Sequence, residues 1–141
     1  MITVRIKFWR FCYIFILHVA TCRSEMRSIM QAKVKGNTLI LIISGDVDHH
    51  SSEIIKQIAD KRIMENNIRN IIFDFSKSTF MDSSGIGVVI GRYKLVNMAG
   101  GRIAAVNINP TIDRIFVISG LNKIIERYDT VEDALMEYQK G

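Results

Sequence analysis

The sequence predicts an α/β fold with a mixed, mainly parallel sheet, and three observations support this. Apolar runs typical of strands covered on both faces occur at 39–43 and 71–75. Apolar stripes with helical spacing separate such runs, so strand and helix segments alternate along the chain. Each connection after the first strand pair has room for one helix, which favours parallel neighbours. The expected order is ββαβαβαβα in a single domain, with about five strands and about four helices.

The first readable unit is a hairpin. Two runs, 31–35 and 38–44, flank the dipeptide Gly36-Asn37, which suits a two-residue hairpin turn. Residues 39–43 are apolar without interruption. We therefore expect the second strand to lie inside the sheet.

A first helix follows the hairpin. Ser51 or Ser52 can cap its N-terminus, and we expect it to end near Asn66-Asn67. A buried strand at 68–75 comes next. The apolar stripe of this helix consists of Ile54, Ile55, Ile58 and Ile63.

A second helix is expected to open at the corner formed by Asp82, Ser83 and Ser84. Gly100-Gly101 closes it, because glycine readily takes the left-handed conformation that follows many helix C-termini. The residues expected on its inner face are Ile86, Val89, Ile90, Tyr93 and Val96.

The last third of the chain repeats the alternation of strand and helix. A strand at 103–108 leads into a short helix with Asn109 as cap and Pro110 at its first position. The remaining expectations are buried positions at Ile112, Ile115 and Phe116, a helix end at Gly120, a strand at 124–125 and a final helix from Thr130 to Gln139.

Length and composition favour one domain with a substantial core. The chain has 141 residues, of which 48% are apolar. Its net charge of +5 suggests a nucleic acid or an anionic membrane as partner. However, residues 1–25 hold four basic residues and one acid, so the rest of the chain is nearly charge-balanced. We expect no direct binding to nucleic acid.

Residues 1–25 differ in character from the rest. A basic stretch precedes the apolar run 11–20, as in a signal peptide, but the run is shorter than the ~20 residues that span a bilayer. Met26 and Met30 offer alternative starts. We favour an over-long start over a functional membrane anchor. The expected division is thus an extension at 1–25 and a domain at 26–141, in the cytoplasm and without membrane association.

Few residues are available for disulfide or metal chemistry. Cys12 and Cys22 both precede Met26, so no disulfide framework or thiolate site can form after it, which agrees with a cytoplasmic location. His49 and His50 are adjacent, whereas a metal pair on a helix needs wider spacing. We expect no metal site and no cofactor.

Residues 80–87 place Ser83 and Ser84 at a strand-to-helix corner behind Asp82. Position alone favours Ser83 as a helix cap, since serine is among the best capping residues. The same corner suits an anion, because free backbone N–H groups and the positive end of the helix dipole meet there. Asp82 is either a first-turn acid favourable to that dipole or a charge that orients the Ser83 hydroxyl.

Residues 80–94 resemble the phosphorylation-site segment of bacterial anti-anti-sigma factors, above all the sporulation antagonists of anti-sigma F factors. Residues 45–50 and 118–125 match the same family, and the resemblance covers roughly 30–138. It implies the fold of the sulfate-transporter and anti-sigma-factor-antagonist (STAS) domain. It also implies that Ser83 is the phosphoacceptor, with Ser84 as the neighbouring cap and a lesser candidate acceptor.

The resemblance further implies a partner surface beside the serine corner. The unphosphorylated protein would bind an anti-sigma factor kinase and release the sigma factor, sigma F of early sporulation. That kinase would supply ATP and Mg²⁺ and phosphorylate Ser83, and a serine phosphatase would reverse this step. The expected partner-binding residues are Asp46, Asp48, His49, His50, Asp82, Ser84, Gly85, Gly87 and Arg92.

Three other functions deserve comparison. A hydrolase with Ser83 as nucleophile lacks the Gly-x-Ser-x-Gly elbow and a recognisable oxyanion donor, so we do not expect an enzyme. Dinucleotide binding fails because Gly91 comes one place too late for the glycine fingerprint that Gly85 and Gly87 begin. A sensory or scaffold domain of the same fold, without a sigma switch, is the alternative. Position alone favours Arg92 as a solvated charge, and its place on the second helix also allows it to face a partner.

Overall fold

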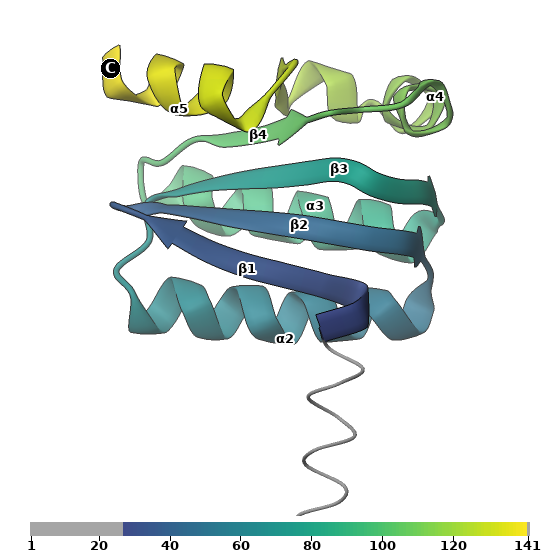
Figure 1. The fold of residues 1–141 in the computed structure, drawn as a ribbon, viewed down its shortest axis with the longest axis horizontal. Helices are drawn as coiled ribbons and strands as arrows, with labels where there is room; N and C mark the ends of the chain where they lie inside the picture. The colour runs from purple at the N-terminus through teal and green to yellow at the C-terminus, as the bar shows by residue number, and fades with distance from the viewer. Residues whose placement is uncertain (1–26, 141) are drawn as a thin grey trace, which may run out of the picture.

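The computed structural model describes residues 27–140, so the extension expected at 1–25 lies outside the described residues. Within that range the sheet has five strands and is flanked by four α-helices and one 3₁₀ turn (Figure 1). The elements are β1 (Met30–Lys35), β2 (Thr38–Val47), α2 (His49–Glu65), β3 (Asn70–Met81), α3 (Ser83–Met98), β4 (Ile103–Val106), α4 (Pro110–Ser119), η1 (Leu121–Lys123), β5 (Glu126–Tyr128) and α5 (Val131–Lys140).

The sheet confirms the predicted α/β class and its order of elements. Its strands lie in the order β1-β2-β3-β4-β5. The β1–β2 pair is antiparallel and closes through the Gly36-Asn37 turn, while the three following pairs are parallel. Strand β2 lies inside the sheet, between β1 and β3, as its uninterrupted apolar run predicts.

The core has two parts, one on each face of the sheet. Residues of α2, α3 and α4 pack with β1, β2 and β3 in the larger cluster, where Phe75 lies edge-on against Phe116 with ring centroids 5.7 Å apart. Helix α5 covers the other face with a smaller cluster that includes Ile40, Ile72 and Ala134. In Figure 1, α3 lies behind β2 and β3, α2 lies below β1, and α5 lies above β4. This layering leaves the ends of the sheet open.

Strand β3 is longer than its apolar pattern predicts. It runs to Met81 instead of ending at Phe75, because its second half continues to pair with β2 through two register shifts, one of them between Gly45 and Asp46. Residues 76–79 in this half are polar, so hydrophobic periodicity could not reveal the pairing. The extension carries the strand directly into the serine corner.

The predicted boundaries near the C-terminal end are wrong in two places. Strand β4 ends at Val106, where Asn107 takes a left-handed φ of 55° that breaks the strand two residues before the expected end. Strand β5 lies at Glu126–Tyr128 and not at 124–125, because the backbone N–H groups of Ile124 and Ile125 bond to the Leu121 carbonyl and close the turn η1.

Candidate functional site

Two parallel strands deliver two helix N-termini to the same edge of the sheet. Val47 at the end of β2 pairs with Met81 at the end of β3, and the Asp82 amide donates to the Val47 carbonyl at 3.0 Å. Helix α2 begins two residues after β2, and α3 begins two residues after β3. The free N–H groups and the positive dipole ends of both helices therefore lie side by side.

Asp48 caps α2, so the prediction of Ser51 or Ser52 as the cap is wrong. The Asp48 carboxylate accepts from the Ser51 backbone N–H at 2.9 Å, and the Ser51 hydroxyl accepts from the Asp48 backbone N–H at 2.9 Å. This reciprocal pair is a capping box, with serine in the third helical position. His49 and His50, expected in a loop before the helix, form its exposed first turn instead.

Asp82 caps α3 in the same way. Its Oδ1 accepts from the backbone N–H of Ser84 at 2.8 Å and of Gly85 at 3.4 Å. Neither Ser83 nor Ser84 is the cap, in contrast to the prediction, because the aspartate one position earlier fills that role. Ser83 stands at the first helical position with an exposed side chain. Within residues 27–140, no hydrogen bond engages its hydroxyl.

A groove of about 340 Å³ separates the first halves of α2 and α3. It brings together four of the predicted partner-binding residues, His49, Ser84, Gly87 and Arg92, which the chain supplies from two helices. It also adds residues that the sequence analysis missed, notably Ser52 and Lys56. Their positions follow His49 at helical spacing, which is the signal that could have identified them.

Arg92 is buried, which corrects its interpretation as a solvated charge. Its side chain is 7% exposed, and its Nε lies 3.1 Å from Asp60 Oδ1 of α2, at ion-pair distance but outside hydrogen-bond alignment. The Arg92 Nη1 and the Ser52 hydroxyl are both buried without a hydrogen-bond partner among the described residues. These two polar atoms belong to residues that line the groove. Such buried atoms cost free energy of folding unless another group bonds to them.

The glycines of α3 do not form a uniform bare surface. A Cβ on Gly85 would lie 2.6 Å from Met81 Cγ and 2.9 Å from Val47 Cγ1, so this glycine allows the helix to pack closely on the strand ends. Gly87 is exposed and has no atom within 4 Å of its Cβ position. Of these two predicted partner-binding positions, only Gly87 offers open surface.

Three carboxylates surround the edge from which the two helices start. Asp46 and Asp48 are exposed and Asp82 is half-buried. The Asp46 carboxylate accepts from the Thr79 hydroxyl. Hydrogen bonds from the Ser51 backbone N–H and, to a smaller extent, from its hydroxyl lower the pKa of Asp48 below 3.8. This rim is acidic, while the adjoining groove contains both charges, with Lys56 and Arg92 beside Glu53.

Among residues 27–140, no three His, Cys, Asp or Glu side chains gather in a way that could hold a metal ion. In the same part of the chain, no helix is long and apolar enough to cross a membrane.

The family model of the STAS domain matches residues 30–134, which include both helix N-termini and the strands that lead to them. The chain belongs to the STAS domain family. This membership confirms the resemblance noted from residues 80–94. It also places the chain among regulatory binding proteins rather than enzymes, as the sequence predicts.

Two curated STAS relatives and two solved structures extend this result. The chain is 41% identical over 101 residues to an anti-sigma F factor antagonist of Paenibacillus polymyxa, covering 72% of this chain and 86% of the relative. It is 31% identical over 108 residues to that of Lysinibacillus sphaericus, covering 77% and 91%. The structure of the anti-sigma factor antagonist SpoIIAA in its unphosphorylated form matches with a TM-score of 0.71 and 31% identity, over 79% of this chain and 97% of that one. The phosphorylated form of SpoIIAA from Bacillus matches with a TM-score of 0.63 and 32% identity, over 77% and 97%.

Proposed function

We propose that this STAS protein is an anti-sigma factor antagonist whose binding to an anti-sigma factor is switched by phosphorylation of Ser83. The observation that carries the proposal is the Ser83 hydroxyl, which is exposed and free of hydrogen bonds to the described residues at the first position of α3. A kinase can reach it without unfolding the helix. The relatives that are named anti-sigma F factor antagonists, and a solved relative in phosphorylated form, support this function.

The unphosphorylated protein binds the anti-sigma factor through the groove between α2 and α3 and the rim around it. The partner would contact the residues that line this groove, among them His49, Lys56 and Gly87. Binding displaces the sigma factor, and the relatives' names make sigma F the first candidate. The resemblance of residues 80–94 to sporulation antagonists suggests an early sporulation role. The protein acts by competition in the cytoplasm and needs no cofactor of its own.

Phosphorylation ends this interaction through charge. It adds about −1.5 to −2 charge at a rim that already holds Asp46, Asp48 and Asp82. A hundredfold loss of affinity needs about 2.7 kcal/mol, which like-charge repulsion and desolvation at an interface can supply. The attraction between the phosphate and the helix N-terminus, about 0.3–1 kcal/mol, is smaller and favours the folded helix. The modification therefore acts on binding and leaves the fold intact.

A phosphorylation assay that also locates the phosphate tests this proposal. Incubation with the candidate anti-sigma factor kinase, ATP and Mg²⁺ should add one phosphate, which peptide mass spectrometry locates at Ser83. Ser83→Ala should bind the kinase without being modified, and Ser83→Asp should bind at least about a hundredfold more weakly. A serine phosphatase should restore binding of the modified protein.

Ser84→Ala is the matched control, because only the backbone N–H of Ser84 contributes to the helix cap. Its Ser83 should still accept one phosphate. Phosphate at Ser84, or equal affinity of Ser83→Asp and wild type, would contradict the mechanism. Failure of the kinase complex to release any sigma factor would favour a sensory or scaffold role for the same fold.

A further inference from the structure

A second cavity opens at the far end of the sheet from Ser83. It has a volume of about 550 Å³ and lies where β2 and β3 begin, beside the Gly36-Asn37 turn and the end of α5. Strand β3 has twelve residues, so its two ends are on the order of 30 Å apart. The cavity has the size of a small-molecule site and shares no lining residue with the groove between α2 and α3.

The cavity is lined by basic and amide side chains and by no carboxylate. Lys35, Arg69 and Arg102 are its three cations. Lys35 is exposed and has no ion-pair partner among residues 27–140. Arg69 directs Nε and Nη2 at the Gly100 carbonyl, at 3.4 and 3.3 Å, which leaves Nη1 available. These charges favour an anion.

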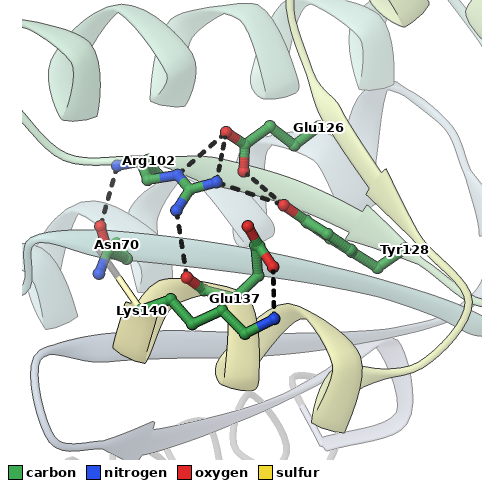
Figure 2. Close-up of polar contacts among 6 residues, drawn as sticks. All are labelled: Asn70, Arg102, Glu126, Tyr128, Glu137 and Lys140. Carbon is green, nitrogen blue, oxygen red and sulfur yellow. Dashed lines mark hydrogen bonds and ion pairs between the residues drawn. The ribbon is translucent and has the colours of Figure 1, made fainter.

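Arg102 forms a rigid wall of this cavity. Glu126 holds its Nε at 3.0 Å and its Nη2 at 2.9 Å, and the Tyr128 hydroxyl lies 3.3 Å from Nη2. Its Nη1 donates to the Glu137 carbonyl at 3.4 Å, and Figure 2 shows the guanidinium enclosed by these groups. The charge of Arg102 is thus largely offset by Glu126, so an incoming anion would meet mainly Lys35 and Arg69.

Tyr138 supplies a donor that the fold leaves unused. Its ring lies beneath Arg102, with the guanidinium carbon 4.8 Å from the ring centroid. Its hydroxyl is buried without a hydrogen-bond partner in the described part of the chain. Burial, the largest cause, raises the pKa of this phenol, so it remains protonated and can donate at neutral pH. The side-chain amides of Asn37 and Gln139, which also line the cavity, form no hydrogen bond within residues 27–140.

We propose that this cavity binds a small organic anion, which carries a carboxylate or phosphate group toward Lys35 and Arg69 and hydroxyl groups toward the amides and the Tyr138 phenol. The volume, the exposed cations Lys35 and Arg69 and the unused donors all point to this class of ligand. The proposal does not depend on the function of Ser83. The ligand would bind at the end of the sheet opposite to Ser83.

Titration calorimetry of the full chain at low salt tests the proposal with three probes. Citrate presents carboxylates, glucose 6-phosphate presents a phosphate ester, and glucose is the uncharged control. We expect saturable one-to-one binding of at least one anion and none of glucose. The anion that binds shows whether the ligand carries a carboxylate or a phosphate group. Lack of saturable binding by both anions would overturn the proposal.

Two variants locate the site. Lys35→Gln should weaken binding at least about fivefold, because it removes one of the two exposed cations of the cavity. Lys33→Gln is the matched control, since it changes the same charge on the same strand outside the cavity, and it should change the affinity less than about twofold. Tyr138→Phe, which removes only the hydroxyl, should also weaken binding. Equal effects of the two lysine variants, or unchanged binding in both Lys35→Gln and Tyr138→Phe, would refute the site.

Discussion

Gly85 and Gly87 are two residues apart in α3 but meet different surroundings. Gly85 is buried where the helix meets the ends of β2 and β3, and a side chain there would collide with Met81 and Val47. Gly87 is exposed above open space. The first glycine is thus required by packing, whereas the second costs helix stability and leaves a gap in the groove between α2 and α3.

Alanine at each position should therefore have opposite effects on stability. We expect Gly85→Ala to lower the free energy of unfolding by about 1–3 kcal/mol through overpacking. Gly87→Ala, the control in the same helix, should raise it by up to about 1 kcal/mol, because alanine is the better helix former. Urea denaturation followed by circular dichroism measures both. A Gly85→Ala protein as stable as the wild type would show that the strand ends can yield to the helix.

The first turn of α2 depends on the charge of Asp48. Hydrogen bonds from Ser51 lower the pKa of this carboxyl group below 3.8, so the ionised form stabilises the folded state. This contribution is fully present above the unfolded value of 3.8 and is lost as the pH falls through the lower folded value.

The pH dependence of Asp48→Asn should reveal this contribution. Asparagine keeps a capping oxygen but does not titrate. The difference in free energy of unfolding between wild type and variant should be constant from neutral pH to about pH 5 and should shrink below it. Urea denaturation at several pH values gives the difference. The same value at about pH 3 and at neutral pH would mean that the charge of Asp48 contributes nothing to the cap.

Helices α2 and α3 are joined by a buried charge. The Arg92 side chain is 7% exposed, and among residues 27–140 only Asp60, itself 36% exposed, lies at ion-pair distance from it. We expect Asp60→Ala to lower the free energy of unfolding by about 1–3 kcal/mol, because it leaves the guanidinium uncompensated. Lys61→Ala, next in the helix with a 72% exposed side chain, should change it by less than about 0.5 kcal/mol.

A second substitution separates charge from packing in this contact. Arg92→Met removes the charge and keeps a long apolar side chain, so the double variant Asp60→Ala/Arg92→Met should be more stable than Asp60→Ala alone. Thermal and urea denaturation compare the variants. If the double variant is the less stable one, the contact matters for its shape and not for its charge.

For the molecule as a whole, the sequence predicts the layers of the fold well and their boundaries less well. The run at 39–43 and the run at 71–75, interrupted only by Asp74, identify two of the inner strands, because burial on both faces leaves a mainly apolar signal. The second half of β3 is polar and forms through backbone pairing with β2, which no side-chain pattern records. The apolar pair Ile124-Ile125 wrongly predicts a strand at 124–125. Ile125 is apolar because it packs into the core at a tight turn, and not because it lies in the sheet.

The sequence predicts the strand-to-helix corner at Asp82 and Ser83 but not the contacts around it. The position of Asp82 and Ser83 can be predicted from the local segment, because a strand-to-helix corner is encoded by neighbouring residues. The roles of Asp48 and Asp82 as caps were missed, since serine and aspartate are nearly equal as capping residues and both occur at each corner. The burial of Arg92 depends on Asp60, 32 positions earlier, and such a contact becomes visible only when the helices are in place.

The strand order β1-β2-β3-β4-β5 has a consequence for biosynthesis, because each strand pairs with the one that precedes it in the chain. When a strand leaves the ribosome, the strand it pairs with has already been synthesised. No strand has to be inserted later between two strands that are already in the sheet. Every intermediate of this assembly exposes one growing edge, and Figure 1 shows that the last strands and α5 finish the stack on the side away from β1. The nascent chain can thus acquire its architecture progressively during translation.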